Sequence, residues 1–267
     1  MSNTLDIVDV VDKFESKLNF TNLEETFESN LSNDKVTIFR LDGHSFSKFT
    51  SNFNKPFDDG FTQAMKTTAE KAFNYFDFSL GFVGSDEITL CIFPKLNKNN
   101  DLCDLEFAGR IQKMTTLLAG FISVTFYKEF SKYHNIEDFT PHFDCRVFQV
   151  DTVQNAIENV MDRICYTLRN SKMMFAQHFF SAKALHKKSS TEAIRMVLDE
   201  KKLDFYDNVS ADNRVGNVLF NKKVDCTKEI VNRDGDTENK IVTFQRNQTV
   251  LQNMGCKEAM SLNEMFV

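Results

Sequence analysis

Apolar and polar residues are arranged along the chain in two alternating patterns. In some segments the apolar side chains recur every three or four residues, which predicts helices with one buried face. In others, short apolar runs rich in β-branched residues are bounded by turn-forming residues, which predicts strands. In chain order these segments are helix 4–28, strand 36–41, helix 58–75, strands 81–83 and 88–93, helix 105–130, strand 143–150 and helix 153–176.

This order of elements indicates the fold class. Strand, helix, strand, strand, helix, strand is the split βαβ plan of ferredoxin-like domains. We therefore expect an α+β fold with an antiparallel sheet and helices on one face. Further along, a basic helical stretch is predicted at 181–204, a short strand at 215–220 and a hairpin around 233–236. The expected organisation is a main domain over residues 1–180, including the N-terminal helix, and a C-terminal helical and hairpin appendage over 181–267.

Composition limits the classes of protein that remain. With 267 residues, of which 42% are hydrophobic, the chain can bury one substantial core. Its net charge of -6 argues against binding nucleic acid over the whole surface, although a local basic groove would suffice for phosphate contacts. The six cysteines form no C-x-x-C pair, so we expect free thiols and no zinc site.

The sequence also bears on location. No apolar run approaches the roughly 18 residues that a membrane span needs. The first residues are rich in acids, unlike a transit peptide. We therefore expect no membrane association and a cytoplasmic protein, with the mitochondrion as the alternative.

Acidic residues mark the ends of two predicted strands. Asp42 closes the first strand, and Asp86 and Glu87 lie in the turn before a later one. Carboxylates that lie side by side at such strand ends repel one another unless a cation binds between them. Oxygen ligands suit Mg²⁺, and two such ions would orient an in-line phosphoryl transfer. The alternative is that these residues only form turns, in which Asp, Gly and Ser are common.

Several segments, taken in order, resemble the tRNA-histidine guanylyltransferase family. The resemblance covers about residues 35–220 and implies a polymerase palm-like domain that works in the 3′→5′ direction. The segments are RLDGHSFSKF at 40–49, NKPFDD at 54–59, GFVGSDEITL at 81–90, R-x-x-K at 110–113, F-D-x-R-V at 143–147 and R-x-G at 214–216.

The resemblance implies a role for individual residues. Asp42, Asp86 and Glu87 would be catalytic, and Asp42 and Asp86 would bridge two Mg²⁺ ions with the Gly43 carbonyl as a further ligand. Backbone N–H groups of the loop after the first strand would face the nucleotide phosphates. Arg110 and Lys113 would bind a second triphosphate or the RNA 5′ phosphate, although an ordinary solvated helix face is the alternative. The nucleotide-binding residues would be Gly43, His44, Ser45, Phe46, Lys55, Asp58, Ser85, Arg110 and Lys113.

Departures from the family pattern favour one of its branches. Guanylyltransferases proper carry H-I-N-N-x-Y-N where this chain has LRNSKMM at 168–174. Arg-Asn-Ser there resembles the guanylyltransferase-like branch, which repairs 5′-truncated tRNAs. Of the family's W-R-Q-x-D only Arg163 remains, and Ser47 replaces a family histidine. The candidate RNA-binding residues are Arg163, Arg169, Asn170, Lys183, Lys187 and Lys188.

These observations favour template-dependent nucleotide addition to the 5′ end of tRNA. The expected substrates are tRNA and nucleoside triphosphates, including ATP and GTP, and the resemblance suggests a homotetramer. One alternative is a guanylyltransferase that adds a single G to tRNA-histidine. Another is a non-catalytic RNA-binding protein of the same fold, which would have no need of Asp42, Asp86 and Glu87.

Overall fold

The computed structural model describes residues 20–135, 139–230, 240–255, 258–259 and 261–262. Most of the predicted helix 4–28 and the predicted hairpin at 233–236 lie outside these residues. The helices are α2 (Phe20–Thr26), α3 (Phe46–Phe49), α4 (Asp59–Tyr75), α5 (Ile111–Phe130), α6 (Val153–Phe179), α7 (Ser190–Lys201), α8 (Phe205–Asn208) and α9 (Ala211–Val215), with 3₁₀ turns η1 (Thr50–Asn52) and η2 (Glu106–Gly109). The strands are β1 (Val36–Gly43), β2 (Leu80–Gly84), β3 (Glu87–Ile92), β4 (Phe143–Val150), β5 (Asn217–Ile230) and β6 (Lys240–Gln252).

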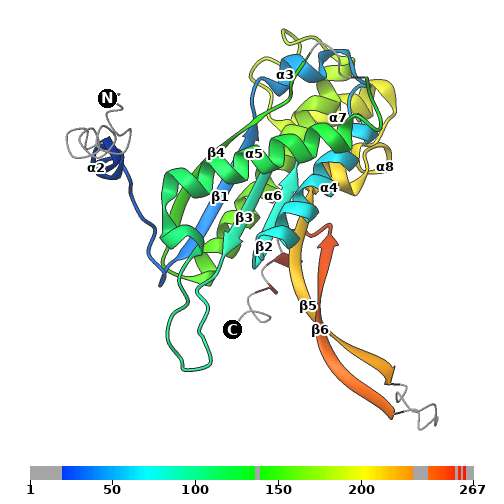
Figure 1. Cartoon of the computed structure of the whole chain (residues 1–267). Helices are drawn as coiled ribbons and strands as arrows, with labels where there is room; N and C mark the ends of the chain where they lie inside the picture. The colour runs from blue at the N-terminus through cyan, green and yellow to red at the C-terminus, as the bar shows by residue number, and fades with distance from the viewer. Residues whose placement is uncertain (1–19, 136–138, 231–239, 256–257, 260, 263–267) are drawn as a thin grey trace, which may run out of the picture.

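The strands form one sheet in the order β4-β1-β3-β2-β5-β6. Every neighbouring pair is antiparallel. The first four strands, with α4 and α5 between them, confirm the split βαβ plan. β5 pairs with β2 and then leaves the sheet with β6 as a long twisted two-stranded arm (Figure 1). The domain division at residue 180 stays a prediction.

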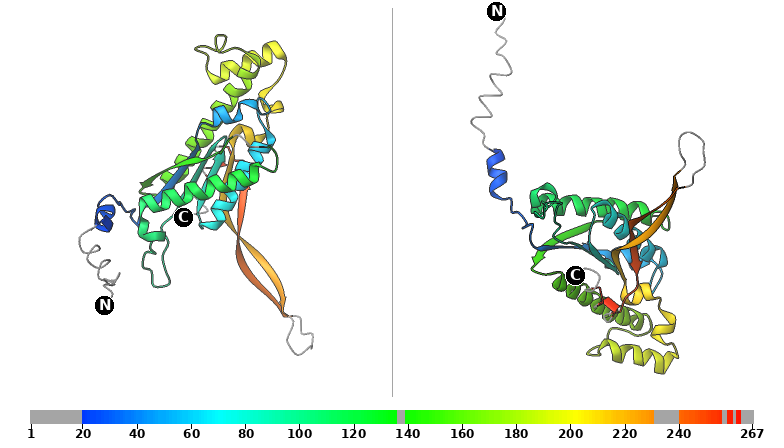
Figure 2. Two further views of the ribbon diagram at one scale, coloured as in Figure 1. Left: turned by 45° about the horizontal axis from the view of Figure 1, so that its top comes forward. Right: turned by 90° about the horizontal axis from the view of Figure 1, so that it is seen from below.

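Helices cover both faces of the sheet, whereas the sequence analysis expected them on one (Figure 2). α4 and α5 pack on the face that carries Phe39 and Leu90. α6 packs on the opposite face, against Ile38 and Phe82. Because every residue of β2 is buried, the sheet has two apolar faces, and each needs a cover that excludes water. The expectation is correct for the two helices of the split βαβ unit and wrong for α6.

α6 runs past the end of the sheet. Its 27 residues begin under the sheet, and its last turns pack with α7 and α8 into a separate small core around Phe175 and Phe205. Figure 1 places α3, α7 and α8 together at the end toward which β1 points. Neither α6 nor any other helix in the described part of the chain is long and apolar enough to cross a membrane.

The predicted basic helix 181–204 is shorter in the structure. α7 starts after Ser189, whose side chain accepts a hydrogen bond from the Glu192 N–H while the Glu192 side chain accepts one from the Ser189 N–H. This reciprocal cap fixes the first turn of the helix. Residues 181–188 form turns instead, with Lys187 at a φ of 61°.

Candidate active site

Strand register brings the predicted catalytic carboxylates together. Asp42 on β1 lies opposite Glu87 on β3 and opposite Asp144 on β4. The Gly43 N–H donates a hydrogen bond of 3.1 Å to the Asp86 carbonyl, so the β2–β3 turn lies against the end of β1. The carboxylates therefore gather where these neighbouring strands begin or end, as their predicted positions at strand ends indicated. Asp144 was not predicted as a site residue, although its place at the start of β4 could have indicated a role.

The surroundings of Asp42 disfavour its negative charge. Burial raises the pKa of Asp42, and the carboxylates of Asp86 and Asp144 raise it further. A cation between Asp42 and Asp86 would relieve this repulsion, and hard oxygen donors fit Mg²⁺. Among the described residues, no three His, Cys, Asp or Glu side chains are grouped as a metal site. A backbone oxygen, such as the Gly43 carbonyl, would have to complete the ligand set.

Glu87 is held by an arginine on α6. Arg163 Nη1 of α6 lies 3.3 Å from Glu87 Oε2, and the two side chains are only 15% and 16% exposed. Burial raises the pKa of Glu87, while Arg163 and Arg40 oppose that rise. The Arg163 guanidinium also contacts the Asp162 carboxylate. The structure thus places this candidate RNA-binding residue beside the predicted catalytic carboxylates, with its charge already paired to Glu87 and Asp162.

The loop after β1 has a fixed shape. A Cβ on Gly43 would lie 2.5 Å from the Phe46 ring, so only glycine fits there. Ser45 adopts a left-handed φ of 57°. The N–H groups of Gly43 and His44 donate to the carbonyls of Asp86 and His142. Of the four N–H groups predicted to face phosphate, those of Ser45 and Phe46 remain without a hydrogen bond among the described residues.

A cavity of about 370 Å³ opens beside this loop. This volume falls in the range typical of small-molecule sites. Six of the predicted catalytic, nucleotide-binding and RNA-binding residues line it: Phe46, Lys55, Asp58, Ser85, Asp86 and Asn170. Because Asp86 belongs both to the carboxylate group and to the cavity wall, a ligand in the cavity would lie beside this predicted metal ligand. The remaining lining residues are Ser47, Thr50, Phe53, Asn54, Pro56, Phe57, Phe61, Thr62, Thr167, Ser171, Met174 and Asn213.

Asp58 organises the wall of the cavity. Its Oδ1 accepts hydrogen bonds from the Phe61 N–H and lies 2.9 Å from His134 Nε2, and its Oδ2 accepts from the Asn54 N–H. Burial alone would raise the pKa of Asp58, but these hydrogen bonds hold it below its usual value. The Asp58 carboxylate thus links the first turn of α4 to the loop before it. Lys55 donates to the Thr50 carbonyl at the rim of the cavity.

Arg110 and Lys113 lie away from the carboxylates. They are at the start of α5, where the Leu31 N–H bonds to the Gly109 carbonyl and Lys113 Nζ lies 4.8 Å from the Phe107 ring centre. The other end of α5, at Phe130, packs against the aromatic residues beside the cavity. A helix of 20 residues is about 30 Å long. Within one chain, the structure does not bring this pair to the predicted metal site.

The other candidate RNA-binding residues surround the outer end of α6. Arg169 and Asn170 are exposed on the helix, and Lys183, Lys187 and Lys188 are exposed in the turns that follow it. They lie at the same end of the molecule as the cavity, and Asn170 lines it. The geometry is compatible with an RNA end that approaches the carboxylates from this side.

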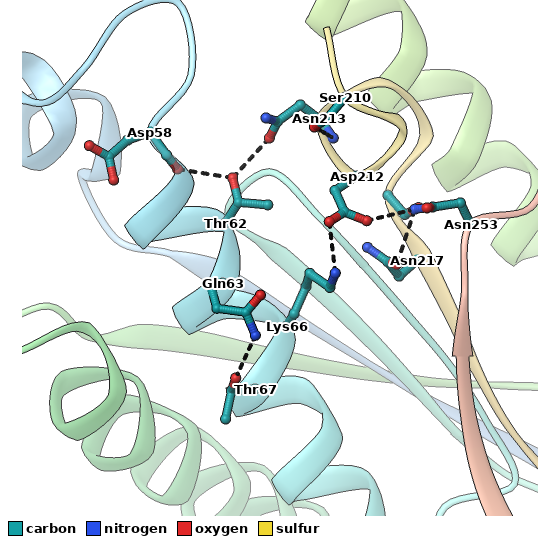
Figure 3. Close-up of polar contacts among 11 residues, drawn as sticks. Asp58, Thr62, Gln63, Lys66, Thr67, Ser210, Asp212, Asn213, Asn217 and Asn253 are labelled. Carbon is teal, nitrogen blue, oxygen red and sulfur yellow. Dashed lines mark hydrogen bonds and ion pairs between the residues drawn. The ribbon is translucent and has the colours of Figure 1, made fainter. Parts of the chain in front are cut away.

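The contribution of α9 to the cavity was not predicted from the sequence. Asn213 Oδ1 lies 2.8 Å from the Thr62 hydroxyl on α4 (Figure 3). The neighbouring Asp212 pairs with Lys66 at 2.7 Å and accepts a hydrogen bond from the Asn253 amide. No local pattern marks Asn213, because its position depends on contacts with residues more than 30 positions away.

Comparison with known proteins identifies the family. Residues 18–151 match the family described as tRNAHis guanylyltransferase. The chain belongs to this tRNAHis guanylyltransferase family. An uncharacterized protein of Acanthamoeba polyphaga mimivirus is 30% identical over an alignment of 215 residues that covers 72% of each of the two chains. Family membership makes the protein a nucleotidyltransferase of the guanylyltransferase-like kind, which adds nucleotides to tRNA.

Solved structures of the family share the fold. A bacterial tRNAHis guanylyltransferase-like protein in complex with ATP superposes with a TM-score of 0.69 at 20% identity, over 76% of this chain and 86% of that one. A bacterial protein of the same description in complex with GTP gives 0.67 at 17% identity, over 93% and 95% of the two chains. The tRNAHis guanylyltransferase of Saccharomyces cerevisiae gives 0.61 at 20% identity, over 73% and 90%. The palm-like α+β fold is therefore confirmed.

Proposed function

We propose that this family member repairs 5′-truncated tRNA by template-dependent 3′→5′ nucleotide addition. The observation that carries the proposal is that the Asp42 and Asp86 carboxylates adjoin a cavity of nucleotide size through Asp86. A nucleotide in the cavity would have its triphosphate beside the carboxylates. The bacterial relatives bound to ATP and GTP support nucleoside triphosphates as substrates.

The protein's own part in the reaction is to bind and align. Asp42 and Asp86 would hold two Mg²⁺ ions with the Gly43 carbonyl, and Glu87 would support them. When bound, the ions supply charge neutralisation at the phosphates and activation of the attacking oxygen. The N–H groups of Ser45 and Phe46, which have no hydrogen bond within the described structure, would donate to phosphate oxygens.

The reaction joins the nucleotide to the RNA by a phosphodiester bond. The 3′-hydroxyl of the incoming nucleotide attacks the activated 5′ phosphate of the RNA, and pyrophosphate or AMP leaves. An RNA that begins with a monophosphate would first be adenylylated at the same centre: its 5′ phosphate attacks the α-phosphorus of ATP, and pyrophosphate leaves. Phosphoryl transfer needs positioning and electrostatic stabilisation more than covalent chemistry by the protein.

Base pairing supplies the selectivity in this proposal. LRNS at 168–171 replaces the family motif H-I-N-N, and Ser47 replaces a histidine, so contacts for one untemplated G are altered. A paired nucleotide is aligned for attack, and a mispaired one is displaced, which costs rate steeply. We further propose a cytoplasmic homotetramer in which Arg110 and Lys113 serve the site of another copy.

The test uses tRNAs that lack their first nucleotide and carry C, G, A or U opposite the gap. Each is incubated with the protein, Mg²⁺ and all four nucleoside triphosphates, and the products are resolved at single-nucleotide length. We expect the base added to follow the opposing base in every case. Addition of G whatever the opposing base, with preference for full-length tRNA-histidine, would establish the single-G guanylyltransferase instead. No addition to any RNA would favour the non-catalytic alternative.

A further inference from the structure

The buried side of α6 becomes polar where it passes the cavity. Ile164 and Phe175 are buried in apolar clusters on either side, but Thr167 and Ser171 occupy the same face between them. Ser171 is 3% exposed, and its hydroxyl has no hydrogen-bond partner within the described structure. An unpaired buried hydroxyl destabilises a fold, so this residue is poorly explained by packing alone. Ser171 lines the cavity, where a ligand could supply the missing partner.

Asn213 offers a second hydrogen-bonding group from another part of the chain. The Thr62 hydroxyl lies 2.8 Å from Asn213 Oδ1 and 3.0 Å from the Asp58 carbonyl. Its single proton can go to only one of these oxygens. In either case, the oxygen or the NH₂ group of the Asn213 amide is left without a partner among the described residues. Because Asn213 lines the cavity, that unpartnered amide group is available to a ligand.

The segment that carries Asn213 is held in place from two sides (Figure 3). Asp212, its neighbour, forms an ion pair of 2.7 Å with Lys66 on α4. Asn253, which follows β6, donates to Asp212 Oδ1 at 2.9 Å and to the Gly216 carbonyl at 2.7 Å. A polar group fixed in this way before a ligand arrives loses little conformational freedom on binding.

The chemistry of the cavity favours a nucleotide base over a phosphate beside Ser171 and Asn213. Its wall includes the apolar side chains of Phe53, Phe57 and Met174, and Lys55 is the one cation among the described lining residues. Hydroxyl and amide groups are neutral and can match the donors and acceptors of a heterocycle. We propose that Ser171 and Asn213 hydrogen-bond the base of the bound nucleoside triphosphate. This inference rests on the nucleotide chemistry proposed above for the same cavity.

The experiment separates the base from the triphosphate. The full-length protein and its Ser171→Ala and Asn213→Ala variants are titrated calorimetrically with ATP, GTP and tripolyphosphate in the presence of Mg²⁺. The matched control is Asn99→Ala, in an exposed loop. Loss of one neutral hydrogen bond should weaken ATP and GTP binding by about 3- to 10-fold and leave tripolyphosphate binding unchanged. Ser171→Ala should also keep or raise the melting temperature of the nucleotide-free protein, because it removes an unpaired hydroxyl.

Three results would overturn the inference. They are unchanged affinity for ATP and GTP in both variants, an equal loss of affinity for tripolyphosphate, and a wild-type protein that binds neither nucleotide. The proposed function fails separately. If the wild-type protein binds nucleotides through these two residues but extends no RNA, the base contact stands and the repair activity is wrong.

Discussion

Replacing Arg163 by glutamine tests whether this arginine holds Glu87 or binds RNA. In the structure its guanidinium lies 3.3 Å from the Glu87 carboxylate, with both side chains about 15% exposed. The variant would leave Glu87 largely buried and without its closest positive partner. Breaking a buried ion pair costs about 3–5 kcal/mol. Because both groups keep some solvent contact and Arg40 still attracts Glu87, we expect a loss of about 2–3 kcal/mol in the free energy of unfolding.

The assay is urea unfolding of four proteins: wild type, Arg163→Gln, Glu87→Gln and the double variant. The double variant removes both charges, so most of the lost stability should return, with a coupling energy of about 1–3 kcal/mol. Arg169→Gln is the matched control, since Arg169 is exposed on the same helix. That change should alter stability by less than about 0.5 kcal/mol.

Activity distinguishes the two roles further. If Arg163 positions Glu87, its replacement should lower the rate of nucleotide addition even at saturating RNA. If it binds RNA instead, the variant should behave like Arg169→Gln, with a weaker affinity for RNA that depends less steeply on salt concentration and a normal rate at saturation. A stability within about 0.5 kcal/mol of wild type, or a coupling energy near zero, would refute the reasoning from the ion pair.

Four further predictions concern other parts of the molecule. Asp86→Ala should lower nucleotide addition by orders of magnitude without loss of stability, because Asp42 is relieved of a repelling neighbour; near-normal addition would contradict the metal assignment. Co-expressed Asp86→Ala and Lys113→Ala chains should be more active together than either alone if Lys113 serves another copy's site, and no recovery would argue against that arrangement. Asp58→Ala should cost about 1–2 kcal/mol at pH 7 through the lost helix cap. Because the folded-state pKa of Asp58 is lowered, this contribution is present above its unfolded pKa of about 3.9 and is lost as the pH falls through the folded value. In urea unfolding, the difference in free energy of unfolding between wild type and Asp58→Ala should therefore be smaller at pH 3 than at pH 7. Burial raises the pKa of Cys91 to about 12, so iodoacetamide at pH 8 should label the exposed Cys103 and Cys165 first, and rapid labelling of Cys91 in the native protein would be inconsistent with the fold.

Local patterns determined much of this protein. Strand and helix periods gave the split βαβ order, because the alternation of buried and exposed positions is a property of neighbouring residues. The predicted positions of Asp42 and Asp86 at strand ends were enough to expect the two residues to lie close together. The spacing of the motifs gave the family, which the comparison confirmed.

Contacts between residues far apart in the sequence could be identified only from the tertiary structure. Motif order predicted a role for Arg110 and Lys113 at the site, but it carries no distance, and the length of α5 separates them from it. Likewise, Ser171 lies on a helix whose period was predicted, yet only the packing of α6 shows that its hydroxyl is buried and has no partner within the described part of the chain. Asn213 reaches the cavity because α4 and the end of β6 hold its helix. Such positions depend on the register of strands and the crossing of helices, which are decided by packing over the whole chain.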